Sequence, residues 1–268
     1  MAVAVLLLHG FGGEPFEMLG LAAALEAAGC ATSVPLLPGH GTSVQDWAAT
    51  GFSDWLAAAE AEYLRLAREH GQVFCCGLSM GGSLCLALGQ RHRPAGIATL
   101  AAPVFLYRFF PYAAADWRLP FLPLLRRVRP FWPMSPRSET SLRRMPWRGY
   151  EGSMSLAALA SFVQGLKAVR QGLGLVRSPL LVVHAERDGT TPPANAREIM
   201  RKAGSARKDL VLLPVAEDGT SHHVLTTHCD HRAKVEQLVL GFVRGLAKGE
   251  ENSPESACGG ACGLEVEA

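Results

Sequence analysis

The stretch that decides the fold is Val73-Phe-Cys-Cys-Gly-Leu-Ser-Met-Gly-Gly, residues 73–82, a β-rich apolar run that ends in Gly77-x-Ser79-x-Gly81. A helical pattern follows directly. A sharp strand-to-helix turn strains the backbone of its central residue, and glycines on either side remove side chains that would clash with neighbouring elements. The sequence therefore predicts a turn that lifts the Ser79 hydroxyl above a sheet, at a helix N-terminus whose dipole favours negative charge.

On both sides of this turn, short apolar runs alternate with amphipathic or alanine-rich stretches. This is the pattern of an α/β fold, with a parallel sheet and helices on both of its faces. We expect strands at Val3–Leu8, Ala31–Leu37, Gln72–Leu78, Ala95–Ala101, Pro179–Ala185 and Asp209–Pro214. We expect helices at Pro15–Ala28, Ser53–His70, Met80–Arg91, Pro193–Ala203 and His231–Leu246.

Length and composition are those of a globular chain without a strong overall charge. The 268 residues are 49% hydrophobic and 19% charged, with a formal net charge of +2. This balance gives no field that argues for nucleic-acid binding. The apolar run Ala2–Leu8 lacks a basic leader and is too short to cross a bilayer, so it is expected to be a buried strand. With Cys75, Cys76 and Cys85 in apolar segments and no signal peptide, we expect a reduced cytoplasmic setting.

Between Pro103 and Tyr150 the alternation of strands and helices stops. Eight prolines, eleven aromatic residues and nine arginines crowd this stretch, against two acidic residues. Proline breaks long helices, and so apolar a stretch does not stay solvated, so we expect a cap without regular strands, closed by a helix at Ser153–Gln171. The expected organisation is a core of residues 1–103 and 173–247, a cap of residues 104–172 and a disordered tail of residues 248–268.

A serine hydroxyl is a weak nucleophile near neutral pH, so Ser79 needs an imidazole base that is oriented by a carboxylate. The apolar run Leu180–Ala185 leads into a turn with Asp188, and Pro192 then opens a helix. This places a carboxylate at the carboxyl edge of the sheet, where ligands bind in such folds. Glu186 is a local rival, but it lies closer to the strand and fits a solvent-facing charge. Asp188 is therefore the candidate acid.

The base is expected on the loop after the last strand, where a histidine can reach over the nucleophile. That loop contains Gly219-Thr-Ser-His-His-Val-Leu, so His222 and His223 are both candidates. The remaining histidines, including His40, His228 and His231, show no complementary cluster in the sequence. We expect them to be ordinary surface or core residues.

Glycines also mark the loop that is expected to stabilise an oxyanion. The segment His9-Gly-Phe-Gly-Gly, residues 9–13, directly follows the first strand. Its flexible glycines let backbone N–H groups face a substrate. We expect the amides of Phe11 and Met80 to form the oxyanion hole. His9 itself is expected to be structural, because such a hole uses backbone groups.

With these residues in place, the chain resembles α/β-hydrolases, and among them bacterial carboxylesterases of the monoacylglycerol-lipase-like type. The resemblance lies in six segments of the sequence. They are the nucleophile elbow Gly77-Leu-Ser-Met-Gly-Gly, Leu6-Leu-Leu-His-Gly-Phe-Gly-Gly, Leu37-Pro-Gly-His-Gly, Thr50-Gly-Phe-Ser-Asp-Trp, the Asp188 turn and Ser221-His-His-Val-Leu-Thr. It implies an acyl-serine intermediate, hydrolysis by water, no metal and no organic cofactor. It also selects His223 as the base, because the family's base precedes aliphatic residues and a threonine, as at Val224, Leu225 and Thr226.

Two features depart from the resembling family. Its members usually begin with one or two strands before the strand that opens here at Val3, so the sheet is expected to lack its first edge strands. Apolar edge backbone that could pair with another chain would then be exposed, which leaves the oligomeric state open. Members also usually carry glycine just before the catalytic histidine, where this chain has His222.

The leading interpretation is a serine hydrolase that cleaves small-molecule carboxylic esters with short to medium acyl groups. A thioesterase or acyltransferase with the same triad is an alternative, and a catalytically inactive binding module is another. The arginines and aromatic residues of the cap suggest either weak contact with an anionic membrane surface or a preference for acidic substrates, although arginine stems that cover apolar surface are the favoured explanation. In the tail, Cys258 and Cys262 could bind a metal or form a redox pair, although an inert tail is favoured.

Overall fold

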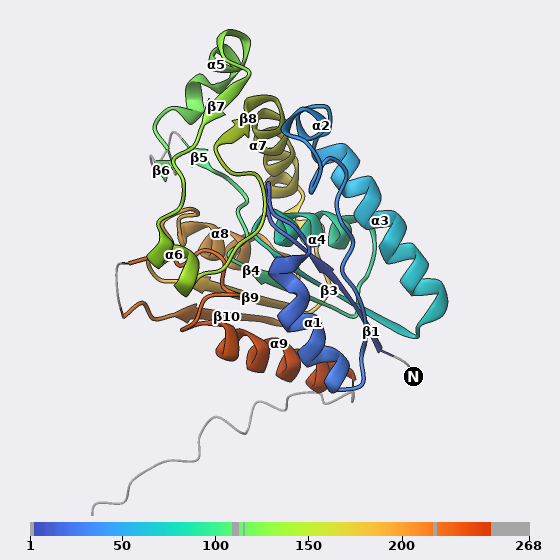
Figure 1. Ribbon diagram of the computed structural model, residues 1–268. Helices are drawn as coiled ribbons and strands as arrows, with labels where there is room; N and C mark the ends of the chain where they lie inside the picture. Colours follow the sequence, from blue (N-terminus) through green and yellow to red (C-terminus); the bar gives the residue numbers. More distant parts are fainter. Residues whose placement is uncertain (1–2, 109–112, 115, 217–218, 248–268) are drawn as a thin grey trace, which may run out of the picture.

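The computed structural model describes residues 3–108, 113–114, 116–216 and 219–247. Its centre is a sheet of six parallel strands in the order β10-β9-β4-β3-β1-β2 (Figure 1). These strands are β1 (Val3–Leu8), β2 (Ala31–Ser33), β3 (Gln72–Leu78), β4 (Gly96–Leu100), β9 (Leu180–Ala185) and β10 (Lys208–Leu213). The predicted α/β architecture with a parallel sheet is confirmed.

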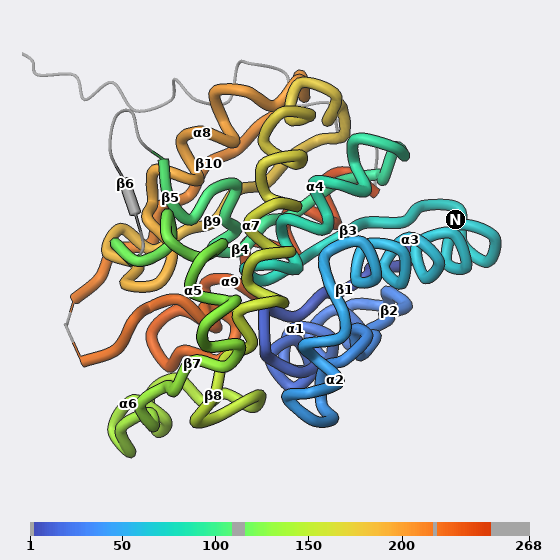
Figure 2. Tube along the Cα trace, turned by 90° about the horizontal axis from the view of Figure 1, so that it is seen from above, coloured from blue at the N-terminus to red at the C-terminus, as the bar shows by residue number. Residues whose placement is uncertain are grey.

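Helices cover both faces of the sheet, because alternate residues of a strand point to opposite sides. In β1, Ala4, Leu6 and Leu8 belong to one hydrophobic cluster, whereas Val5 and Leu7 belong to the other. The first cluster draws side chains from α2 (Val44–Ala48), α3 (Phe52–Glu69), α4 (Met80–Arg91), α7 (Leu156–Gln171) and α8 (Ala194–Lys202), and the second from α1 (Phe16–Ala27) and α9 (Arg232–Ala247). In Figure 2, α4 and α8 lie on one side of the sheet, and α1 and α9 lie on the other. Burial on both faces explains the nearly continuous apolar sequences of the strands.

The edge of the sheet differs from the sequence-based expectation. The strand predicted at Ala31–Leu37 ends at Ser33, because Pro35 cannot donate to a strand ladder and the Leu37 N–H donates to Nε2 of His9 instead. β2 is the outer strand beside β1, and its three residues, Ala-Thr-Ser, are all half-buried. As expected, no described strand lies outside β2. The exposed edge is nevertheless short, and two of its three residues are polar, so the expected apolar character is wrong.

The described residues between 104 and 172 lie over the end of the sheet that carries Ser79, with α5 at the top of Figure 1 and α6 at its left. They contain η1 (Leu119–Phe121), α5 (Leu122–Val128), α6 (Glu139–Arg144), and two antiparallel ribbons, β5 (Tyr107–Arg108) with β6 (Ala113–Ala114) and β7 (Phe131–Pro133) with β8 (Ser153–Ser155). The expected absence of strands is therefore wrong, because proline is tolerated in a two-stranded ribbon whose outer N–H positions need no partner.

The closing helix α7 begins at Leu156, three residues later than predicted, because Ser155 is its N-cap and accepts the Ala158 N–H. A turn of 3-10 helix, η2 (Leu173–Leu175), then leads back into the sheet. The tail with Cys258 and Cys262 lies outside the described residues. In the described part of the chain, no helix combines the length and the apolar character needed to cross a membrane.

Candidate active site

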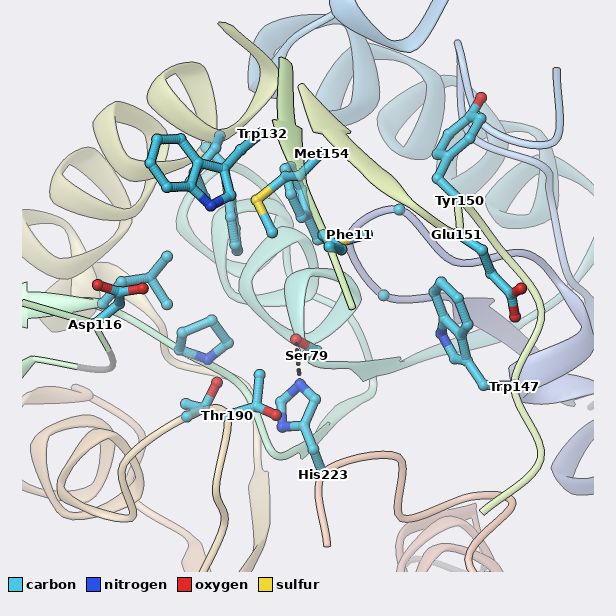
Figure 3. A pocket seen from close by; sticks show the side chains of 18 of the residues that line it. Phe11, Ser79, Asp116, Trp132, Trp147, Tyr150, Glu151, Met154, Thr190 and His223 are labelled. Carbon is cyan, nitrogen blue, oxygen red and sulfur yellow. Dashed lines mark hydrogen bonds between the residues drawn. The ribbon is translucent and has the colours of Figure 1, made fainter. Parts of the chain in front are cut away.

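The candidate nucleophile occupies the turn that the sequence predicts. Ser79 lies between β3 and α4 with φ 52° and ψ −118°, a backbone conformation that costs a residue with a side chain roughly 1–3 kcal/mol. A β-carbon on Gly77 would overlap the backbone of Gly81, and one on Gly81 would overlap the Leu8 carbonyl group. The glycines therefore let the elbow pack against β1, and the strained residue directs its hydroxyl into a pocket (Figure 3).

Three side chains from distant parts of the sequence form one hydrogen-bonded line. The Nε2 atom of His223 lies 2.9 Å from Ser79 Oγ, and its Nδ1 atom lies 2.8 Å from Asp188 Oδ2. Each of the three residues is 8% exposed, so the line is shielded from bulk water. If Nδ1–H donates to the carboxylate, Nε2 is left to accept the serine proton. The structure thus brings Ser79, His223 and Asp188 together, whereas Glu186 is exposed outside this line.

Neighbours that the sequence analysis did not single out hold the Asp188 side chain. Its Oδ1 atom accepts the N–H groups of Thr190 and Thr191 at 2.7 and 2.8 Å, and His184 Nε2 lies 3.4 Å from Oδ2. Burial acts to raise the pKa of Asp188, but the rings of His223 and His184 outweigh it and hold the pKa well below its usual range. Asp188 is therefore ionised at neutral pH, as a group that orients an imidazole must be.

The residues whose amides are expected to form an oxyanion hole, Phe11 and Met80, belong to the loop after β1 and to the start of α4. Phe11 lines the pocket with Ser79, and a β-carbon on Gly10 would lie 3.5 Å from Ser79 Cβ. Met80 is the first residue of α4, so its N–H is among those that a helix leaves without an internal acceptor. The Phe11 ring stacks on Phe162 with centroids 5.1 Å apart, which anchors the loop to α7.

Glu17 is a functional candidate that the sequence analysis missed. Its side chain is 2% exposed, lines the pocket and accepts the Gly10 N–H at 2.7 Å. Burial raises the pKa of Glu17 to about 7, even though hydrogen bonds from Gly10 and Trp147 act to lower it. Glu17 shares the buried face of α1 with Leu21 and Leu25. In the sequence, an acidic residue at an i, i+4 spacing from apolar residues could have indicated a buried carboxyl group.

The pocket is a cavity of about 460 Å³ between the sheet end and residues 104–172. In Figure 3, Trp132 and Met154 lie above Ser79, and Trp147 lies across the cavity from them. Most of its other lining from residues 104–172 is also apolar, including Leu106, Leu119, Leu122, Leu125, Leu156, Leu159 and Phe162. The volume is within the range of about 300–1,000 Å³ typical of small-molecule sites. The cavity therefore suits an apolar group placed next to Ser79.

A histidine cluster beside the candidate base contradicts one expectation. His222 has a φ of 51°, a left-handed backbone that explains why glycine suits this position. Its ring lies next to those of His228 and His231, with centroid distances of 4.7 and 5.3 Å. The expectation that His228 and His231 lack a complementary cluster is therefore wrong. The chain turns back on itself, since the His228 N–H donates to the Val224 carbonyl, and this turn was not visible as a sequence period.

The chain matches known proteins along most of its length. It matches the family described as "Serine aminopeptidase, S33" over residues 1–226. It is 31% identical over 243 residues to the thermostable monoacylglycerol lipase of a Bacillus species, an alignment that covers 90% of this chain and 91% of that protein. It is also 35% identical over 104 residues to a carboxylesterase of Bacillus subtilis, covering 38% of this chain and 42% of that protein.

Solved structures extend this similarity to the fold. A metagenome-derived lipolytic enzyme is 28% identical with a TM-score of 0.78, covering 90% of this chain and 93% of that one. The monoglyceride lipase of Saccharomyces cerevisiae, solved as a soluble variant, has a TM-score of 0.74 at 16% identity, covering 92% of this chain and 87% of that one, and shows the fold alone. The chain therefore belongs to the serine aminopeptidase, S33 family of α/β-hydrolases and is a hydrolase.

Proposed function

We propose that this hydrolase is a serine esterase for carboxylic esters with short to medium acyl groups. Ser79 is its nucleophile, His223 its general base and Asp188 the acid that orients the base. The observation that carries the proposal is the hydrogen-bonded line from Asp188 through His223 to Ser79, at the edge of an apolar cavity. The similarity to a monoacylglycerol lipase over 90% of the chain supports the same reaction class.

In the acylation step, His223 Nε2 takes the Ser79 proton while Oγ bonds to the acyl carbon. The carbonyl oxygen becomes an oxyanion, whose stabilisation we assign to the amides of Phe11 and Met80. The ester C–O bond then breaks, and His223 returns its proton to the departing alkoxide. An alcohol leaves, and the acyl group remains on Ser79.

In the deacylation step, water takes the place of the alcohol. His223 accepts a proton from the water while the water oxygen bonds to the acyl carbon. His223 then protonates Ser79 Oγ as the bond between Oγ and the acyl carbon breaks. A carboxylic acid leaves, and the triad returns to its starting state. The ionised Asp188 stabilises the imidazolium form of His223 in both steps.

We assign residues 1–103 and 173–247 to the catalytic core and residues 104–172 to a cap. The assignment is supported by the cavity, because the nucleophile and base come from the core while most of the apolar lining comes from the cap. A reducing compartment such as the cytoplasm fits the buried thiols of Cys75, Cys76 and Cys85.

The outer surface of the cap supports contact with an anionic lipid surface. Four large apolar side chains around α5 are between 55% and 79% exposed, namely Trp117, Phe121, Leu124 and Val128. Exposed arginines lie among them in the sequence, at Arg126, Arg127 and Arg129. Apolar side chains flanked by cations suit the boundary between acyl chains and anionic headgroups. Such docking would bring the cavity, which α5 also lines, close to ester substrates.

A fluorophosphonate probe and an ester panel test the proposal. The probe should label the wild type and Ser135→Ala, which alters another serine of the pocket lining, but not Ser79→Ala. The wild type should also hydrolyse nitrophenyl esters of short and medium acyl chains with a higher kcat/KM than the matching acyl-CoA thioesters. Labelling of Ser79→Ala would refute the assignment of the nucleophile. A clear preference for acyl-CoA would favour the thioesterase alternative.

A further inference from the structure

Three histidines form a cluster that is separate from the cavity lining. His222, His228 and His231 are 2%, 0% and 3% exposed, and the distances between their ring centroids run from 4.5 to 5.3 Å. Burying an imidazole costs free energy unless its two ring nitrogens are satisfied. The esterase mechanism uses only the adjacent His223, so these three histidines take no part in it.

The ring nitrogens of the cluster converge. One nitrogen of each ring lies within 4.8 Å of one nitrogen of each other ring, and His222 Nδ1 lies 3.1 Å from His231 Nε2. In a tetrahedral zinc site the metal–nitrogen distance is about 2.0–2.1 Å, which places ligand nitrogens about 3.3 Å apart. The His222 and His231 nitrogens already have this spacing. Only the nitrogen of His228 has to move closer.

Metal binding would change the present hydrogen bonds of His228. Its Nε2 atom lies 2.8 Å from the Thr220 hydroxyl, and its Nδ1 atom accepts the Asp230 N–H at 3.2 Å. The Asp230 carboxylate is 4.0 Å from the same Nδ1 atom. When Nε2 binds a metal, the proton moves to Nδ1, so Nδ1 gives up the Asp230 N–H and the Asp230 carboxylate has to move closer to accept the proton. A carboxylate behind a ligating imidazole is the usual outer partner of a zinc-bound histidine.

The backbone strain at His222 also supports a bound ligand. A residue with a side chain at a φ of 51° is strained by about 1 kcal/mol or more, a cost that glycine avoids. The strained turn directs two adjacent side chains in different directions: His223 contacts Ser79, and His222 contacts His231 in the cluster. A ligand that binds the His222 ring would offset the strain.

We propose that His222, His228 and His231 bind one divalent transition-metal ion, with Zn²⁺ the best match to three imidazoles and an open fourth position. Imidazole is the commonest protein ligand for such ions. The ion would fix the loop between β10 and α9, which also carries His223. This binding is independent of the esterase proposal and can be measured without a substrate.

The test uses the untagged full chain with Cys229→Ser, Cys258→Ser and Cys262→Ser, which removes competing thiols outside the core. Co²⁺ is titrated while visible absorption is followed, and Zn²⁺ binding is measured by calorimetry and by thermal unfolding. We expect one ion per chain, the intense visible bands of tetrahedral Co²⁺, and a rise in Tm on the order of 5–10 °C when free Zn²⁺ is about 100 times its Kd.

Variants decide whether the three histidines hold the ion. His222→Gly should fold, because glycine suits its backbone, and it should lose at least about tenfold in affinity together with the rise in Tm. His231→Ala should lose both as well. His70→Ala, which alters a histidine at the end of α3, should bind like the parent chain. A parent chain that binds no ion would overturn the proposal, and so would His222→Gly and His231→Ala binding as tightly as the parent.

Discussion

The Nε2 atom of His223 lies 2.9 Å from the Oγ atom of Ser79, across 144 positions of the sequence. The contact exists because β3 and β10 belong to one parallel sheet, so the turns that follow them meet at the same edge. The separation is that of a hydrogen bond through which a proton can pass in a general-base step.

Asp188→Asn should lower kcat by roughly 10⁴ while the fold is kept, because an amide holds the imidazole in the wrong tautomer. Glu186→Gln is the matched control, since this acid is two residues away and exposed. It should retain nearly all activity. Steady-state kinetics on a nitrophenyl ester separate the two variants, and equal losses would argue against Asp188 as the orienting acid.

Gly81→Ala should destabilise the protein by on the order of 3 kcal/mol, because the added β-carbon overlaps the backbone carbonyl of Leu8 and neither backbone can yield cheaply. Gly241→Ala is the control within α9, where an added β-carbon meets no atom of the described chain within 4 Å. It should stabilise by about 0.5–1 kcal/mol. Urea unfolding measures both changes, and an unaltered midpoint for Gly81→Ala would contradict the packing described here.

Glu17 should make the protein less stable as pH rises. Burial raises its pKa from 4.5 to about 7, so between these values the folded state keeps a proton that the unfolded state releases. The free energy of unfolding therefore falls through this window, by roughly 3 kcal/mol for this group. Glu17→Gln keeps an acceptor for Gly10 but cannot ionise.

The stability of Glu17→Gln relative to wild type should therefore increase by about that amount between pH 5 and pH 8. Denaturant unfolding at both pH values measures this difference. Glu186→Gln provides the reference for a carboxyl group that is exposed. A Glu17→Gln difference that stays constant with pH would show that the buried carboxyl group does not titrate in this range.

The exposed apolar surface of the cap should bind anionic vesicles at low salt. Replacing Trp117 and Leu124 with aspartate should weaken binding by at least about tenfold, because two apolar contacts are lost and two repulsive charges are added. Leu19→Asp is the control, since Leu19 is 53% exposed on α1. Vesicle sedimentation measures the partition, and equal binding by all variants would remove the cap from the contact.

The sequence predicts most of the core because its signals are local. The elbow around Ser79 needs only its own glycines, and the central strands are apolar runs whose register follows from burial on both faces. The strand at Ala31 was predicted too long because the hydrogen bond from Leu37 to His9 is a long-range contact. The short ribbons of the cap were missed because their strands pair through tertiary contacts, and because the many prolines of this stretch argue against strands.

The candidate site divides in the same way. The positions of Ser79 and Asp188 follow from turns that end buried strands. Glu17 and His184 were missed because each is a polar residue inside an otherwise apolar pattern. The role of each depends on its tertiary contacts, with Gly10 for Glu17 and with Asp188 for His184. The cluster around His222 required a turn whose shape no periodicity encodes.

The role of Ser79 as the nucleophile is tested most directly by the kcat of Ser79→Ala on a nitrophenyl ester, measured together with the thermal unfolding of the variant. We predict a loss on the order of 10⁶ in kcat, the scale seen when a triad nucleophile is removed, with the fold retained. Alanine has the same β-carbon as serine, so Ser79→Ala keeps the backbone strain at φ 52° and should have a Tm close to that of wild type. Near-normal ester turnover by a folded Ser79→Ala protein would contradict the assignment of Ser79 as the nucleophile.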